Sequence, residues 1–302
     1  MLASKRLREG RARRKDRVLK ATPVRLPDVG YIEQEPAHPL AHVVRSVWIQ
    51  QVGAAPYLQR NLPTGGVELH CRIGSVPRLV GPLTHALTDL LEPGTTLVGV
   101  RFQPGAAAPL LGLPASELAD LELGTDDLWG TEAVRLGELL AAAPGPEAAL
   151  YVLQRYLAAR LAATEGPDQL VAEAVRQLMP WHPGDVGTVT AGLSISESQL
   201  RRRCHATVGL GPKALHRTLR FQGFLALAQQ SIATGSGSGL SELAVEAGYA
   251  DQAHLSRECL RLSGLSPRAF IGDAGERCAC GHDHTVSFSS MLRTRPPAGV
   301  AV

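Results

Sequence analysis

A repeat in the last third of the chain constrains its fold more than any other feature. Residues 199–215 align with residues 254–270 without a gap, at an offset of 55 residues, and seven of the 17 pairs are identical. Each copy reaches a glycine, Gly209 or Gly264, that is followed by Leu-x-Pro. Glycine ends helices in the left-handed conformation, and proline favours the first turn of the next helix. The repeat therefore predicts one helix-ending motif that is used twice.

A second short helix is expected before each repeated helix. The apolar periodicity predicts helices over 186–193 and 240–247, each ending three or four residues before the repeated helix begins. Gly248 supplies the turn in the second copy, and Ser194 takes its place in the first. This spacing is that of a helix-turn-helix unit. The sequence thus predicts two such units, joined by a long helix over 212–232.

Helical geometry separates the inward faces of the two repeated helices from their outward faces. Ser196 and Gln199 form a capping-box pair at the start of the first helix, and Asp251 is the expected N-cap of the second. Residues three or four apart share a face, which turns a leucine, a cysteine and a further aliphatic residue inward in each copy. The polar positions can pair with base edges, and the predicted DNA-binding set is Ser196, Ser198, Gln199, Arg201, Arg202, His205, Asp251, Gln252, Ala253, His254, Ser256 and Arg257. An arginine-rich face seen alone is more often solvated, and the duplicated context is what favours DNA.

The segment from about residue 168 to residue 271 resembles the DNA-binding domain of the AraC/XylS family of transcription regulators. The most specific stretch, residues 240–270, is close to a family signature. The resemblance implies seven helices, with two helix-turn-helix units and a long connecting helix. From the joined pair of units we expect entry into successive major-groove faces about 34 Å apart. It implies a bacterial regulator, with activation as the expected effect and RNA polymerase as a further partner. Cys204 and Cys259 stand where the family usually has phenylalanine, which predicts a leaner core and leaves a redox role for these thiols open.

The first half of the chain has a different pattern, in which strands precede helices. Short apolar runs predict strands over 43–50, 67–73, 79–80 and 96–102, and residues 63–66 have the turn chemistry of a hairpin. Helical periodicity follows, over 105–111, 114–121, 131–143 and 147–163. The expected fold class is therefore multidomain, with an N-terminal sheet-rich α+β domain and a C-terminal all-α domain that carries two helix-turn-helix units.

These patterns divide the chain into four parts. We expect a basic disordered arm over 1–22, an effector-binding or dimerisation domain over 23–164, the DNA-binding domain over 168–272 and a disordered Cys/His-containing tail over 273–302. The second part more weakly resembles the N-terminal domain of one branch of these regulators, which implies a small-molecule effector or a homodimer. Its last helix, with a leucine stripe, packs on its own domain or forms a dimer seam.

The charge of the chain is uneven. The first twenty residues hold nine Lys or Arg against two acidic residues, although the net charge of the whole chain is only +3. Such an arm is attracted to phosphates or is merely solvated. No apolar run is long enough for a membrane span or a signal peptide, and five cysteines are too few for a secreted disulfide scaffold, so we expect a cytoplasmic protein with reduced thiols.

Two groups of residues carry ligand chemistry outside the repeat. The tail has Cys278, Cys280, His282 and His284 at every second position, which suits Zn²⁺ or Cu⁺ if the segment folds around a metal. The alternative function is therefore a DNA-tethered metal or redox sensor, or an alkyl-transfer repair protein, that uses the two tail cysteines.

The other group lies in the predicted strands. Glu68 and His70 share one strand face while Cys71 points to the other, which makes a poor metal set. Arg60 and Arg101 either hold an anionic ligand or pair with carboxylates. The sequence contains no set of nucleophile, base and orienting residue, and no enzyme activity is expected.

Overall fold

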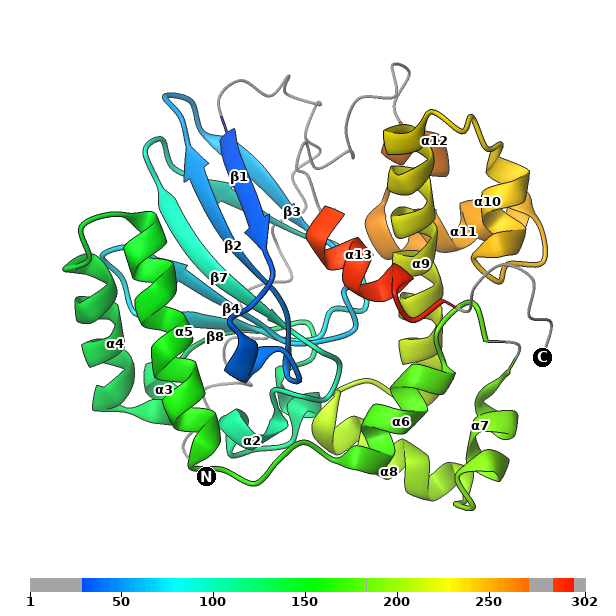
Figure 1. The fold of residues 1–302 in the computed structure, drawn as a ribbon, viewed down its shortest axis with the longest axis horizontal. Coiled ribbons are helices and arrows are strands. Elements are labelled where there is room, and N and C mark those ends of the chain that lie inside the picture. Colours follow the sequence, from blue (N-terminus) through cyan, green and yellow to red (C-terminus); the bar gives the residue numbers. More distant parts are fainter. Residues whose placement is uncertain (1–28, 183, 272–284, 296–302) are drawn as a thin grey trace.

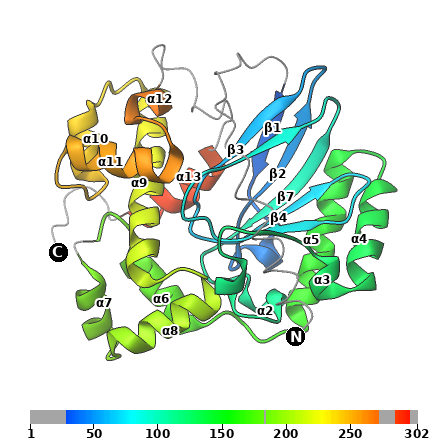
Figure 2. The same ribbon diagram turned by 180° about the vertical axis from the view of Figure 1, so that it is seen from behind.

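The computed structural model describes residues 29–182, 184–271 and 285–295. A sheet-rich N-terminal domain lies beside a helical C-terminal domain, and a short helix from the C-terminal part of the sequence lies between them (Figures 1 and 2). The two-part fold class expected from the sequence is confirmed.

The N-terminal domain is built on an antiparallel six-stranded sheet in the order β1-β2-β7-β4-β5-β8. Its strands are β1 (Val29–Gln34), β2 (Val44–Val52), β4 (Glu68–Arg72), β5 (Arg78–Val80), β7 (Thr96–Phe102) and β8 (Glu122–Gly124). A separate two-stranded sheet pairs β3 (Tyr57–Asn61) with β6 (Leu87–Leu91). The four strands predicted from apolar runs are confirmed within a few residues, whereas β1, β3, β6 and β8 were not predicted.

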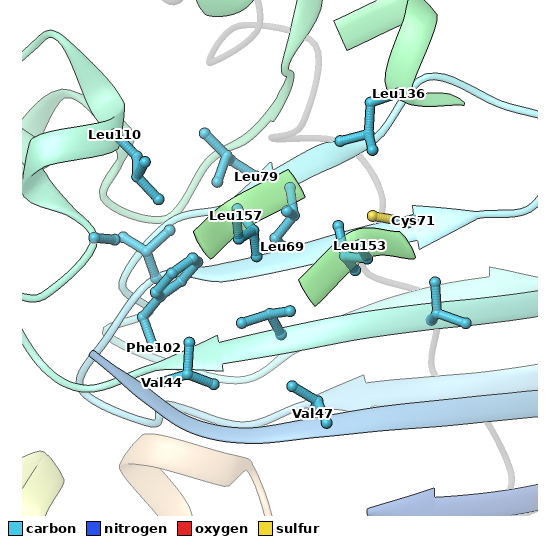
Figure 3. Packing of buried hydrophobic residues seen from close by; sticks show 14 of the residues in the cluster. Val44, Val47, Leu69, Cys71, Leu79, Phe102, Leu110, Leu136, Leu153 and Leu157 are labelled. Atoms are coloured by element: carbon cyan, nitrogen blue, oxygen red, sulfur yellow. The ribbon is translucent and has the colours of Figure 1, made fainter. Parts of the chain in front are cut away.

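One face of the six-stranded sheet carries the main core. Helix α5 (Pro146–Ala162) covers this face, with α4 (Thr131–Ala141) beside it (Figures 1 and 3). Leu150, Leu153 and Leu157 of α5 are buried in this core, so the leucine stripe packs on its own domain and is not a dimer seam. The layer also contains η1 (His38–Leu40), α2 (Ala108–Leu111), η2 (Ala115–Leu118) and α3 (Asp126–Trp129).

The opposite face of the sheet holds a smaller apolar cluster under the β3–β6 pair. Trp48 of β2 packs there with Tyr57 of β3 and Leu91 of β6. The indole of Trp48 lies directly on β7, where a β-carbon at Gly99 would be 2.1 Å from the ring. Glycine at this position therefore makes room for the tryptophan.

The C-terminal domain is entirely helical in its described residues. Its helices are α6 (Gln169–Gln177), α7 (Val186–Gly192), α8 (Glu197–Thr207), α9 (Pro212–Thr234), α10 (Leu240–Glu246), α11 (Gln252–Ser263) and α12 (Pro267–Ile271). Long helix α9 connects α7 and α8 near one of its ends to α10 and α11 near the other (Figure 1). No helix in the described ranges combines the length and the apolar character needed to cross a bilayer.

Two predictions about local structure were wrong. The loop 62–66 does not close a hairpin between β3 and β4, because β3 pairs with β6 while β4 pairs with β5 and β7. The turn chemistry is real, since Gly65 has a φ of +84°, but the loop turns toward α9. The helix expected over 114–121 is only the 3-10 turn η2, and the chain then enters β8.

The tail also differs from expectation. Residues 285–292 form helix α13 (Thr285–Leu292), so the expectation of a disordered tail from residue 273 is wrong for this segment. Eight residues are too few to form a stable helix alone, and α13 is helical because it packs against α9, β1 and β2. The basic arm over 1–22 lies outside the described residues.

Candidate nucleic-acid interface

Helix α8, the first of the two predicted reading helices, begins with the predicted capping box. The backbone N–H of Gln199 donates to Oγ of Ser196 at 3.2 Å, and the N–H of Ser196 donates to Oε1 of Gln199 at 2.9 Å. These bonds satisfy backbone donors that the first turn leaves unpaired. The start of α8 is therefore fixed by its own sequence.

Helix α11, the second predicted reading helix, is capped by a different residue to the same effect. Oδ1 of Asp251 accepts a 2.6 Å bond from the N–H of His254, as predicted. The turns before the two helices also match, because Ser194 and Gly248 both adopt positive φ values, of +54° and +78°. Ser194 thus takes the left-handed position that glycine occupies in the second copy, as the alignment predicted.

Some of the predicted DNA-binding side chains are engaged within the protein, and others are exposed to solvent. Ser196 and Asp251 are used as caps, Gln199 is held in the capping box, and Oε1 of Gln252 accepts a 3.0 Å bond from Ser241. His254 is half-buried against the ring of Tyr249. The side chains of Ser198, Arg201, Arg202, His205, Ala253 and Arg257 are exposed, while Ser256 is half-buried and donates to the carbonyl of Gln252.

The arginines of the two helices are not equivalent. Arg203 pairs with Asp168 at 2.6 Å, and Arg261 lies 3.8 Å from Glu258. Arg202 and Arg257 occupy matching positions in the two copies and have no ion pair within the described part of the chain. Arg201 of α8 is also exposed and has no ion pair among the described residues, so Arg202 and Arg257 are the unpaired arginines that recur at the same position in both copies.

The inward faces follow the predicted periodicity. Leu200, Cys204 and Val208 of the first copy are buried, and so are Leu255, Cys259 and Leu262 of the second. Burial raises the pKa of Cys204 and of Cys259 to about 12. Because the thiolate is the reactive form, both cysteines act as small apolar side chains and are poor redox sensors.

Two segments of the chain match known protein families. Residues 189–272 match the family described as a helix-turn-helix domain. The C-terminal domain is an AraC-type helix-turn-helix domain. Such a domain binds double-stranded DNA, and the protein is a DNA-binding transcription regulator. Residues 32–123 match a domain of unknown function.

Solved structures give a weaker likeness, to ToxT of Vibrio cholerae. An apo ToxT variant from strain SCE256 is 10% identical with a TM-score of 0.43, over 74% of this chain and 96% of that chain. ToxT from strain O395 is 12% identical with a TM-score of 0.41, over 74% and 95%. ToxT with bound unsaturated fatty acid is 11% identical with a TM-score of 0.38, over 80% and 94%. These values are too low to transfer any property of ToxT, and no curated protein sequence matches the chain.

The N-terminal domain contacts the C-terminal ends of α8 and α11. Beyond α8, a β-carbon at Gly209 would lie 2.5 Å from Cγ of Pro82 and 2.6 Å from the carbonyl oxygen of Ala115. At the end of α11, Nη1 of Arg60 donates a 3.0 Å bond to the carbonyl of Ser263. A cation is favourable at a helix C-terminus, so Arg60 stabilises α11 from the other domain.

A buried ionic cluster lies on the sheet face toward the helix-turn-helix domain. Arg101 pairs with Glu33 at 2.6 Å and with Glu68 at 3.0 Å, and its side chain is only 11% exposed. Burial opposes ionisation of Glu68, but the charge of Arg101 and the bond from His70 outweigh it and hold its pKa well below the usual range. Of the two roles expected for Arg101, the structure shows the carboxylate pair, although in a buried site.

Sequence reasoning missed Glu33 and Ser46 as members of this cluster. Oγ of Ser46 donates to Oε1 of Glu33 at 2.6 Å, and both residues are buried. Ser46 gave a signal, as a polar residue within a strand that is otherwise buried, whereas Glu33 gave none, because its neighbours Ile32 and Gln34 are exposed. The neighbouring cavity, lined in part by Trp48, Arg60 and Arg101, measures about 50 Å³, which is room for a few waters and not for a drug-sized molecule.

The predicted metal site stays a prediction. Cys278, Cys280, His282 and His284 lie outside the described residues, and the repair or sensor alternative that depends on them lies there too. Within the described residues there is no cluster of three or more metal-ligating side chains. Cys71 lies in the core on the face opposite to Glu68 and His70, as the strand alternation predicted.

A buried histidine of α9 makes the stability of the protein depend on pH. Burial and the charge of Arg220 lower the pKa of His216 to about 4. Below about pH 6.5 the unfolded chain binds a proton that the folded chain does not, so stability is lost as the pH falls from about 6.5 to 4. We measure the free energy of unfolding in urea at pH 7 and at pH 5. The decrease between the two pH values should be about 1–3 kcal/mol smaller in His216→Gln than in the wild type.

The exposed His205 on α8 provides the control for this measurement. His205→Gln should leave the difference in unfolding free energy between pH 7 and pH 5 as in the wild type. An equal difference in the wild type and in His216→Gln would show that His216 does not carry this dependence.

Proposed function

We propose that the protein reads a specific DNA sequence with α8 and α11, which enter successive faces of the major groove. The observation that carries this proposal is the matching pair Arg202 and Arg257, exposed and unpaired among the described residues at equivalent positions of the two copies. An arginine can donate two hydrogen bonds to one guanine. Helix α9 supports the spacing, because its 23 residues correspond to about 34 Å, one turn of B-DNA.

We further propose that the N-terminal domain controls this reading by sensing an effector or by dimerisation. Support comes from its contacts with both reading helices, through Gly209 after α8 and through Arg60 at the end of α11. A shift of the sheet relative to α9 would move these contacts together. Activation through RNA polymerase remains a prediction from the resemblance to the AraC/XylS family.

Selection of bound sequences from random double-stranded DNA, followed by affinity measurement, tests the first proposal. We expect specific binding whose affinity falls steeply with salt concentration. Arg257→Ala should cost about 1–3 kcal/mol and relax the preference at one base pair of the selected site.

The matched control is Arg261→Ala, on the same helix and with the same loss of charge, but at an arginine that lies near Glu258. It should weaken binding to all sequences alike and leave the base preference intact. If Arg257→Ala and Arg261→Ala gave the same sequence profile, α11 would not read bases through Arg257.

A further inference from the structure

Helix α13 is inserted between the N-terminal domain and α9 (Figures 1 and 2). It comes after the whole helix-turn-helix domain in sequence, yet it packs against β1 and β2, more than 230 residues earlier. The partners of its side chains show what this position does.

Ser287 joins α13 to the ionic cluster of the N-terminal domain. Its N–H donates to Oε2 of Glu33 at 3.2 Å, and its Oγ lies 2.6 Å from Oε1 of the same carboxylate. Its carbonyl accepts a 3.1 Å bond from Nε of Arg45, and Nη1 of Arg101 donates to its Oγ at 2.7 Å. A carboxylate at the first turn of a helix is favourable, so Glu33 also stabilises α13 itself.

The apolar side chains of α13 enter the cores of both helix-turn-helix units. Phe288 is buried in the cluster of the second unit, which contains Leu255 and Cys259. Met291, one turn later, is buried in the cluster of the first unit, which contains Leu200 and Cys204. Two side chains one turn apart on α13 therefore pack in two different cores, each of which also contains residues of α9.

The three residues after Leu292 also contact the N-terminal domain and both helix-turn-helix units, through polar side chains. Arg293 pairs with Glu35 of the N-terminal domain at 3.1 Å. Thr294 accepts a 2.9 Å bond from Nε1 of Trp181, which packs with the first unit. Arg295 pairs with Glu246 of α10 in the second unit. Three successive residues thus bind three different parts of the protein.

We propose that residues 285–295 form an internal clasp that holds the N-terminal domain and the two helix-turn-helix units in one arrangement, and thereby fixes the spacing between α8 and α11. The loop before α10 contains Gly235, Gly237 and Gly239, so the chain itself leaves the second unit free to turn. The clasp removes this freedom. Its effect on DNA rests on the proposed function, whereas its effect on domain coupling does not.

The test uses the full chain with Phe288→Ala and Met291→Ala together, and calorimetry as the first readout. We expect one unfolding transition in the wild type and two in this variant, because the domains then unfold separately. The control is Ser290→Ala, on the same helix and outside both cores, which should keep one transition. A single, unshifted transition in the Phe288/Met291 variant would overturn the clasp.

The second readout is the affinity for a selected DNA site and for the same site lengthened by one base pair between its halves, a rotation of about 35°. The wild type should lose about tenfold in affinity on lengthening, and the Phe288/Met291 variant less than about threefold. Equal losses in both proteins would contradict the claim on spacing. A wild type that bound no sequence specifically would refute the proposed function, and calorimetry would still decide the clasp.

A milder variant covers the case in which the two core substitutions prevent folding. Arg293→Ala with Arg295→Ala removes two exposed or half-exposed ion pairs and leaves every core side chain in place. In this variant the loss of affinity on lengthening the site by one base pair should be about threefold, against about tenfold in the wild type. The same loss of affinity as in the wild type would count against the clasp.

Discussion

Replacing Arg101 with methionine is expected to lower the free energy of unfolding by about 3–5 kcal/mol, because two buried carboxylates then lose their common partner. Glu33 and Glu68 lie 2.6 and 3.0 Å from this guanidinium, and the side chain of Glu33 is only 1% exposed. Arg45 is the other arginine near the cluster, but it faces Ser287 and Gln222. Urea unfolding at pH 7 measures the effect.

Arg78→Met is the matched control, since Arg78 also pairs with a glutamate across the same sheet, at 2.6 Å from Glu122, but is 53% exposed. Its loss should cost less than about 1 kcal/mol. Loss of Arg101 raises the pKa of Glu68 in the folded variant, so this carboxylate is protonated at low pH and no longer carries a buried charge. The stability difference between the wild type and Arg101→Met should therefore be smaller below about pH 4.3 than at pH 7. Equal costs for the two variants at pH 7 would show that the cluster is solvated.

The second large effect is expected at the glycine that ends the first copy of the repeat. Gly209 and Gly264 have φ values of +84° and +73°, so alanine at either position pays for a left-handed backbone. Only at Gly209 is another domain close enough to clash, because a β-carbon there would lie 2.5 Å from Pro82 and 2.6 Å from Ala115. At Gly264 the nearest atom, Nη1 of Arg60, would be 3.8 Å away. Gly209→Ala should therefore cost about 3 kcal/mol or more, and Gly264→Ala about 1 kcal/mol.

The two variants control for each other, because the repeat supplies the same backbone in two surroundings. Thermal and urea unfolding give the two costs, and their difference measures the contact between the domains at the end of α8. If both substitutions cost the same, the close approach of Pro82 and Ala115 to α8 would be absent in solution.

The helix-turn-helix domain could be predicted from the sequence because its determinants are local. The N-caps Ser196 and Asp251 and the turn residues Ser194 and Gly248 act within a few residues of themselves. Helical periodicity then sorts inward from outward side chains without knowledge of any distant contact. An arginine-rich helix face in a single copy is more often merely solvated, and it was the second copy that favoured DNA binding.

Pairing between strands could not be predicted in the same way. Residues 63–66 have turn chemistry, but whether β3 then pairs with β4 or with β6 depends on Trp48, which needs a cover that the β3–β6 pair supplies. The polar cluster depends on residues from four strands, β1, β2, β4 and β7, and from α13. Glu33 and Ser287 are 254 residues apart, and nothing near either residue in sequence indicates the other.

Helix α13 was missed for a related reason. Its apolar residues Phe288, Met291 and Leu292 have helical spacing, but the segment is too short to be helical without the cores that it enters. Ordering of this segment is a consequence of tertiary packing. Composition alone therefore suggested a tail.

The position of α13 also sets an order of events during synthesis. The ribosome makes β1 and β2 long before Ser287 and Phe288, so the nascent sheet carries its ionic face without the segment that later covers it. Contacts over such a separation in sequence slow folding. Before residues 285–295 are made, the two domains are therefore held together only by their direct contacts, such as Arg60 with Ser263, and the ionic face of the sheet is uncovered.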